Sequence, residues 1–316
     1  MTSIKMKAIV CKKSGKPDVL SFMDWPKPKP GKAEILIKVD ASSVTRGDVN
    51  LRKIPRILLH SLGLFFGFKP MVITGIEFSG VVETIGQNVS RFKPGDQVFG
   101  TTTGLKYGGN AEYVCVPEKW KMGVVEHKPV NLTFVESAVL PVGTMTSLDM
   151  FRRTNIKQGD KILVYGASGS VGSYAVQIAR YFSAEVTAVC GTNNVELVKS
   201  LGAVRVIDYT KDDFTKEEMV YDIVFDAVGK LRKYKCKKVL NTKGQFLTVR
   251  LPTKERPEHL KMIKDLCESG VIKPLIDKIY ALHQVPEAHE YVQSGRKKGN
   301  VAIKTDWLIN STKTDQ

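Results

Sequence analysis

The sequence lacks the cysteine arrangements of disulfide scaffolds and zinc sites. Its five cysteines, Cys11, Cys115, Cys190, Cys236 and Cys267, are scattered and include no C-x-x-C pair. Thiolate metal sites favour such pairs, and disulfide scaffolds favour a dense, even set of cysteines. We therefore expect reduced thiols, no bound metal and a cytoplasmic location.

Long apolar runs are also missing. No stretch approaches the roughly 18 apolar residues that a spanning helix needs. The first residues, MTSIKMKAIVCKK, reach charged side chains before any apolar stretch typical of a secretory signal. We expect neither a spanning helix nor a signal peptide.

Acidic residues are scarce relative to basic ones. The chain has 32 Asp and Glu against 48 Lys and Arg, a formal net charge of +16. An excess of positive charge favours RNA or an anionic membrane surface as a partner, but dispersed surface lysines give the same total. Both interpretations stay open at this point.

What the sequence does contain is a glycine-rich turn at residues 161–180, KILVYGASGSVGSYAVQIAR. An apolar run typical of a buried parallel strand leads into the turn, and helical spacing follows it. Such a turn lets backbone N–H groups approach a pyrophosphate at a helix N-terminus. A second predicted strand, Glu185–Cys190, completes a βαβ unit. The predicted dinucleotide-binding residues are Gly166, Ala167, Ser168, Gly169, Ser170, Val171 and Gly172.

Short strands dominate the N-terminal part, and strands alternate with helices after Leu148. The first pattern predicts an irregular β-barrel-like domain and the second a doubly wound parallel sheet. The tail returns to strand character. The predicted strands are 6–10, 34–39, 78–85, 97–99, 111–116, 161–165, 185–190, 205–207, 222–225, 245–249 and 301–304.

Several stretches resemble the zinc-free quinone oxidoreductase branch of the medium-chain dehydrogenase/reductase superfamily. They are TGIEFSGVVETIGQNVSRFKPGDQVFG, GGNAEYVCVP, LPVGTMTSLDMF, VYGASGSVGSYAVQIAR, LVKSLGAVRVIDYT and YDIVFDAVG, in family order. Within the branch, the chain is similar to zeta-crystallin-like, chloroplast-envelope and reticulon-interacting oxidoreductases. The resemblance implies an α/β fold with a GroES-like domain, residues 1–125 with 273–316, and a Rossmann domain, residues 126–272.

The resemblance also allows the zinc site to be tested by position. Where zinc-dependent relatives place cysteine, histidine and cysteine, this chain has Thr45, Ile76 and Val142. These side chains are not the ligands that zinc takes in proteins. The structural zinc lobe of those relatives is absent too, and we predict no metal. Glu77 remains without ligand neighbours, and we expect a structural role for it.

Cofactor choice is predicted from the turn after the second Rossmann strand. An acid there would accept hydrogen bonds from the ribose 2′-OH of NAD, whereas this chain reads Val189, Cys190, Gly191, Thr192. NADPH is therefore expected. Thr192, Asn193 and Lys199 are candidate phosphate donors, although the first two also suit a helix cap and Lys199 a solvated helix. By family position, Tyr209 contacts the 2′-phosphate, and Thr146, Ala227, Val228 and Gly229 line the bound cofactor.

The chemistry is expected to come from the nicotinamide, because no nucleophile, paired histidine or carboxylate dyad is apparent. The resemblance implies hydride transfer to a quinone or an α,β-unsaturated carbonyl. Thr45, Asp48 and Tyr107 are candidates for orienting the substrate, although Thr-Arg-Gly-Asp replaces the family's Asn-Pro-x-Asp. The five histidines are expected to be structural or solvent-facing.

Two further stretches bear on function. The apolar segment 54–71, flanked by positive charge, suits a lid over the substrate or an interfacial element. After the strand 245–249, only residues 250–256 precede the next predicted helix, too few for a parallel crossover. The sixth Rossmann strand is therefore expected to be missing.

Two functions remain open: an NADPH-dependent quinone or enone reductase, and an NADPH-binding protein that acts on RNA or a membrane surface.

Overall fold

The computed structural model of the chain describes residues 4–55, 57, 58, 61, 65, 72–102, 108–119 and 123–305. The chain divides into two compact units. The first comprises Met1–Pro141, Arg256–Lys264 and Ile276–Gln316, and the second Val142–Glu255 and Asp265–Leu275. The domain limits expected from the sequence stay predictions, because the units group residues by contacts alone.

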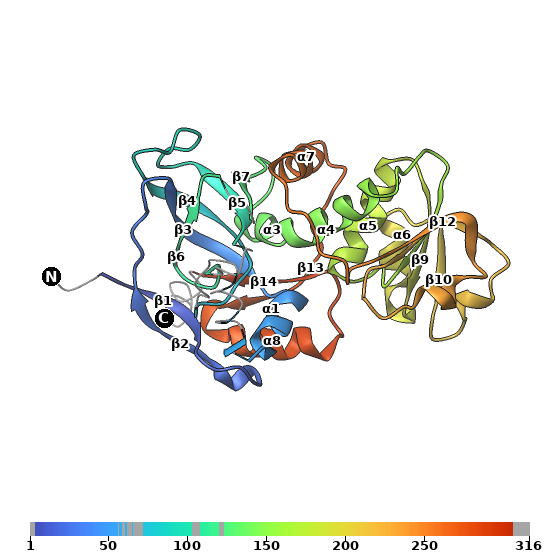
Figure 1. The fold of residues 1–316 in the computed structure, drawn as a ribbon, viewed down its shortest axis with the longest axis horizontal. Coiled ribbons are helices and arrows are strands. Elements are labelled where there is room, and N and C mark those ends of the chain that lie inside the picture. The colour runs from blue at the N-terminus through green and yellow to red at the C-terminus, as the bar shows by residue number, and fades with distance from the viewer. Residues whose placement is uncertain are drawn as a thin grey trace, which may run out of the picture. The chain divides into compact units, whose positions relative to one another are not determined.

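The first unit is built on a seven-stranded sheet in which β3 (Glu34–Ser43) is the central strand (Figure 1). One edge of β3 pairs antiparallel with β4 (Glu77–Ile85). Its other edge is shared by β6 (Tyr113–Pro117) and β14 (Asn300–Lys304). The remaining strands are β5 (Gln97–Thr101), β7 (Val125–His127) and β13 (Ile276–Ala281), and β1 (Lys5–Cys11) and β2 (Leu20–Pro26) form a separate antiparallel pair.

Alternation along the strands builds the core of this sheet. Ile35, Ile37 and Val39 of β3 point to one face, where they pack with Phe78 of β4 and Val98 of β5. All five side chains are at most 1% exposed. The strands predicted in this part of the chain are confirmed, whereas β2, β7 and β13 were not predicted.

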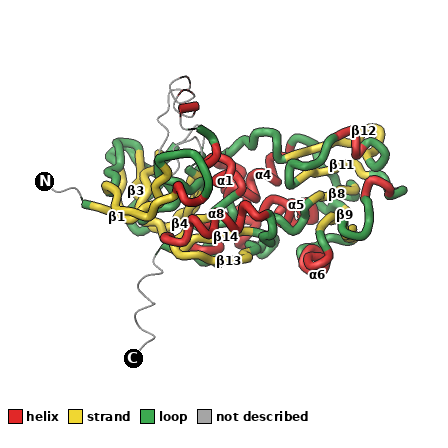
Figure 2. The backbone as a smooth tube through the Cα atoms, turned by 90° about the horizontal axis from the view of Figure 1, so that it is seen from below, coloured by secondary structure: helices red, strands yellow, loops and turns green. Residues whose placement is uncertain are grey.

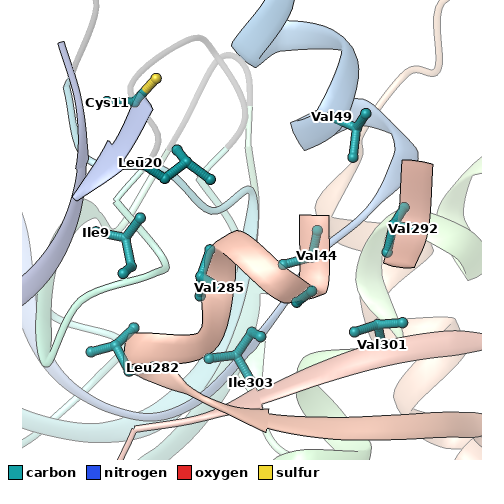
Figure 3. Close-up of a cluster of buried hydrophobic side chains, with 11 residues drawn as sticks. Ile9, Cys11, Leu20, Val44, Val49, Leu282, Val285, Val292, Val301 and Ile303 are labelled. Carbon is teal, nitrogen blue, oxygen red and sulfur yellow. The ribbon is translucent and has the colours of Figure 1, made fainter. Parts of the chain in front are cut away.

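A second core joins the ends of the chain. The strand β13 runs parallel to β14, and the connection between them contains η5 (Leu282–Gln284) and α8 (Val285–Ser294). Figure 3 shows side chains of α8 and β14 gathered with Ile9 and Cys11 of β1 and with Val49 of α1 (Arg46–Lys53). The described part of the tail therefore packs within the first unit. Two shorter helical elements of this unit are η1 (Pro17–Val19) and α3 (Phe134–Ala138).

The second unit is a five-stranded parallel sheet in the order β10-β9-β8-β11-β12. Figure 2 shows β9, β8, β11 and β12 following one another in this order. This order is that of a doubly wound sheet with β8 at its centre. Across the residues that the structure describes, the sheet has no sixth strand, as predicted. The strands are β8 (Lys161–Tyr165), β9 (Glu185–Cys190), β10 (Arg205–Asp208), β11 (Tyr221–Asp226) and β12 (Leu240–Thr248).

Helices and turns cover both faces of this sheet. On one face α5 (Ser170–Tyr181) packs against β8 and β9. Phe151 of α4 (Pro141–Arg152) meets Phe225 of β11 edge-on, with 5.6 Å between the ring centroids. On the opposite face Leu163 and Val224 pack against the segment between β11 and β12. The other elements are η2 (Thr192–Asn194), α6 (Val195–Ser200), η3 (Phe214–Lys216) and η4 (Lys233–Cys236). The helix α7 (Pro257–Glu268) is divided between the two units after Lys264.

The buried side chain of His289 holds α8 against α1 in the first unit. His289 is 0% exposed, and its Nδ1 accepts a hydrogen bond from Arg52 Nη1 at 3.0 Å. Burial, and secondly the positive charge of Arg52, lower the pKa of His289 to about 3. Arg52 also donates to the carbonyl of Gly15 and to Gln293. The structural role expected for this histidine fits its position.

We predict that His289 makes folding sensitive to acid. Its folded pKa of about 3 lies below the ordinary value of 6.5, so the unfolded state takes up the proton first. The stabilisation is complete above pH 6.5 and is lost as the pH falls toward 3. Between pH 7 and 5 the wild type should lose about 2 kcal/mol more unfolding free energy than His289→Asn, measured by denaturant titration. Equal losses of unfolding free energy in wild type and His289→Asn would contradict this account. So would a control variant at an exposed histidine, His283→Asn, that reduced the loss as much as His289→Asn does.

Candidate functional site

The turn after β8 needs glycine at its first position. Gly166 has φ +79°, a region that disfavours other residues. A Cβ added there would lie 2.1 Å from Val228 Cγ2. The N–H groups of Gly166 and Ala167 both donate to the carbonyl of Val189, at 3.0 and 3.1 Å, and so tie the turn to β9.

The turn opens directly into α5, with Gly169 as the N-cap residue. The first bond inside the helix is the one that Ser173 N–H donates to the Gly169 carbonyl, at 2.9 Å. The N–H groups of Val171 and Gly172 precede that bond, so they have no acceptor within the helix. Together with the helix dipole, they make this end of α5 favourable for an anion.

Gly172 and Gly169 differ in the space that a side chain would have at each position. A Cβ on Gly172 would lie 2.1 Å from the Gly166 carbonyl oxygen, so the helix could not pack so closely against the turn. A Cβ on Gly169 would meet only that same oxygen, at an ordinary 3.4 Å. The space beside Gly169 is therefore open. This open backbone at a helix N-terminus fits a pyrophosphate, and it brings together all seven residues predicted from 166–172.

The carboxyl ends of β9 and β10 lie side by side, since Cys190 and Asp208 are paired in register. Thr192 Oγ1 donates to one oxygen of Asp208 at 2.6 Å, and Thr210 Oγ1 donates to the other at 2.8 Å. These bonds, that of Thr192 first, lower the pKa of the Asp208 carboxyl. Asp208 thus holds the turn that begins at Gly191. The hydroxyl hydrogen of Thr192, a predicted phosphate donor, is directed to Asp208.

The other residues predicted for the adenosine end lie around this turn. Tyr209 is 57% exposed, and its Oη would lie 3.3 Å from a Cβ on Gly191, so the phenol borders the turn. Asn193 is exposed. Lys199 pairs with Glu196 at 2.9 Å on the surface of α6. Tyr209 and Asn193 are the better placed donors.

A buried carboxylate shapes the loop after β11. Asp226 is 0% exposed and accepts hydrogen bonds from the N–H groups of Val228, Gly229 and Leu231 at 2.8–3.1 Å. It also accepts one from the hydroxyl of Thr248. These bonds fix the predicted residues Ala227, Val228 and Gly229 next to the turn after β8. Neither Asp226 nor Asp208 was among the site residues predicted from the sequence.

The short connection after β12 contacts the residues predicted to line the cofactor. Arg250 Nε donates to the carbonyl of Gly229 at 2.7 Å. Thr253 Oγ1 lies 3.1 Å from Thr146 Oγ1, and Thr146 is 7% exposed. The N–H of Lys254 donates to Asp149 on α4. Although the sixth strand is missing, this connection still anchors both the Gly229 loop and Thr146.

In the first unit, Thr45 and Asp48 form a capping box at the start of α1. The N–H and hydroxyl of Thr45 donate to Asp48 Oδ2 at 2.8 and 2.6 Å, and Asp48 N–H donates to Thr45 Oγ1. Burial raises the pKa of Asp48 to about 6, against the opposing effect of the Thr45 bonds. Each side chain satisfies the other, which gives them a role in shaping the helix. The third predicted residue, Tyr107, lies outside the described residues.

The positions that hold zinc ligands in zinc-dependent relatives carry no replacement ligand cluster. Ile76 is 4% exposed and packs in the interior. Its neighbour Glu77 is 1% exposed and accepts a hydrogen bond from Ser43. Within the described residues, no three His, Cys, Asp or Glu side chains are placed to hold a metal. Glu77 thus has the structural contact expected for it.

Comparison with protein families agrees with this geometry. Residues 31–127 match the alcohol dehydrogenase GroES-like domain. Residues 170–273 and 247–303 match two zinc-binding dehydrogenase families. Together these matches include strands from both units.

Individual proteins match along most of the chain. A 2-methylene-furan-3-one reductase from Solanum lycopersicum is 33% identical over 291 residues, 85% of this chain and 71% of that protein. A chloroplastic NADPH-dependent alkenal/one oxidoreductase from Arabidopsis thaliana is 31% identical over 95% of this chain and 79% of that protein. The structure of a quinone oxidoreductase from Coxiella burnetii superposes with a TM-score of 0.82 at 26% identity, covering 96% of this chain and 100% of that one. The chain belongs to the medium-chain dehydrogenase/reductase superfamily.

We predict that two alanine substitutions in the turn separate folding from cofactor binding. Gly169→Ala adds a methyl group to open space, so the thermal midpoint should stay near that of the wild type while the Kd for NADPH rises about tenfold or more. Gly172→Ala forces a Cβ against the Gly166 carbonyl and should cost about 1–3 kcal/mol of stability. Thermal unfolding and fluorescence titration measure the two effects. Unchanged NADPH affinity in Gly169→Ala would contradict the site.

Proposed function

We propose that this chain is an NADPH-dependent oxidoreductase that transfers a hydride to a quinone or an α,β-unsaturated carbonyl. The observation that carries the proposal is the open backbone beside Gly169, at the N-terminus of α5 and next to the loop held by Asp226. Relatives named as an alkenal/one oxidoreductase, a 2-methylene-furan-3-one reductase and a quinone oxidoreductase support the choice of substrate class.

The preference for NADPH over NADH rests on the turn after β9. No carboxylate follows Cys190 directly, where an acid would favour the 2′-OH of NAD. Asp208 lies nearby, but both its oxygens accept hydrogen bonds, and Lys211 Nζ lies 3.9 Å away. Its charge is thus partly offset. Tyr209 and Asn193 are exposed and carry donors for a 2′-phosphate.

NADPH supplies the hydride when bound, and the protein's part is to bind and orient. The N-terminus of α5 would hold the pyrophosphate, and Val228, Gly229 and Thr146 would hold the nicotinamide end. Arg250 and Thr253 position those groups from the connection after β12. The orientation is therefore set by elements of a single compact unit.

We further propose that the reaction needs no zinc and that the protein is cytoplasmic. Thr45, Ile76 and Val142 stand where zinc-dependent relatives place ligands, and the Thr45 hydroxyl is engaged with Asp48. None of the three is a usual zinc ligand. The scattered cysteines support a reducing compartment.

We predict that NADPH oxidation depends on an added 1,4-quinone or enone. Activity should survive a strong chelator, and the Kd for NADPH should be about tenfold or more below that for NADH. Gly169→Asp, which places a negative charge at the open backbone, should abolish turnover while the protein stays folded. The assay is absorbance of the reduced nicotinamide, with a no-enzyme control. Equal affinity for NADH, or activity lost on chelation and restored by zinc, would overturn the corresponding part of the proposal.

A further inference from the structure

The segment between β11 and β12 carries an unusual density of positive charge. Residues 230–238 read KLRKYKCKK and contain no acidic side chain. We call this segment the basic crossover. Its six cations, all exposed, are Lys230, Arg232, Lys233, Lys235, Lys237 and Lys238.

The basic crossover is held rigidly from its inner side. Leu231 is 9% exposed and Cys236 is 0% exposed, and both pack with Leu163 and Val224 on one face of the parallel sheet. Val239, just beyond the segment, is buried in the same cluster. The apolar side chains therefore fix the backbone, and the cations can only face outward.

Within the described part of the chain, the six cations form no ion pair with an acidic side chain within 4.0 Å. One of them, Lys235, acts on the carboxylate of Asp213. The pKa of Asp213 is lowered mainly by a hydrogen bond from Thr215, with Lys216 and Lys235 as smaller causes. One cation of the six thus faces a carboxylate from another element. The remaining charge is available to an external anion.

The composition of the surface indicates what kind of anion it suits. Five of the six cations are lysines, which act as hydrated point charges, whereas bidentate phosphate recognition favours arginine. Tyr234 is 72% exposed between Lys233 and Lys235, and tyrosine is enriched at membrane interfaces. Binding of single-stranded RNA typically uses several aromatic side chains on which successive bases stack, and the basic crossover has only Tyr234. A polybasic segment with one amphipathic aromatic ring is typical of binding to anionic lipid.

We propose that the basic crossover docks this protein on an anionic lipid bilayer. The docking does not depend on the proposed enzymatic function. If that function also holds, docking brings the loop at Val228 and Gly229, which directly precedes Lys230, close to the membrane. A quinone or enone dissolved in the lipid would then be concentrated near the cofactor end of the sheet.

The test compares two triple variants that remove the same charge. Lys233→Gln, Lys237→Gln and Lys238→Gln neutralise the basic crossover. Lys12→Gln, Lys13→Gln and Lys16→Gln neutralise three exposed lysines near β1. Binding is measured by sedimentation with phosphatidylcholine vesicles, with or without 30% phosphatidylserine, at low and high salt.

The wild type should bind only the phosphatidylserine vesicles and be released at high salt. The crossover variant should lose about a hundredfold in partition coefficient, and the control variant should bind as the wild type does. Equal loss in both variants would overturn the proposal in favour of net charge alone. Tighter, salt-sensitive binding to single-stranded RNA than to the vesicles would overturn it in favour of RNA. Because both variants should still reduce a water-soluble quinone, failure to dock and failure of the proposed function are distinguishable.

Discussion

The whole cofactor site depends on how closely two stretches of backbone approach each other. Gly172 lies so near the Gly166 carbonyl that no side chain fits between them. This contact lets the first turn of α5 reach the carboxyl edge of β8, where its N–H groups become available to an anion. The open space beside Gly169 follows from the same packing. A larger residue at 172 would move the helix and close the site without touching a ligand.

Two buried carboxylates fix the other loops at the carboxyl edge of the parallel sheet. Asp226 organises the loop after β11, and Asp208 organises the turn after β9, each by accepting several hydrogen bonds. A buried charge is costly unless it is paired in this way, so each loop is held in one conformation. Arg250 and Thr253 extend the arrangement to the connection that replaces the sixth strand.

Local patterns were enough to predict most of the fold. The apolar run before Gly166 and the helical spacing after it identify β8, α5 and the turn, and the seven residues after Val249 are too few for another strand. The strand β2 escaped prediction because it alternates weakly and exposes much of its length. The roles of Asp208 and Thr253 could not be predicted either. They act on Thr192 and Thr146, which are 16 and 107 positions away in sequence.

The central claim is that a hydride passes directly from NADPH, held at this edge of the sheet, to an acceptor carbon. It is tested most directly with NADPH that carries deuterium at the transferred position and with an enone as acceptor. The account predicts one deuterium in each reduced product molecule, at the β-carbon, detected by mass spectrometry and NMR. Reduced product without deuterium, or with label taken only from deuterated water, would contradict it.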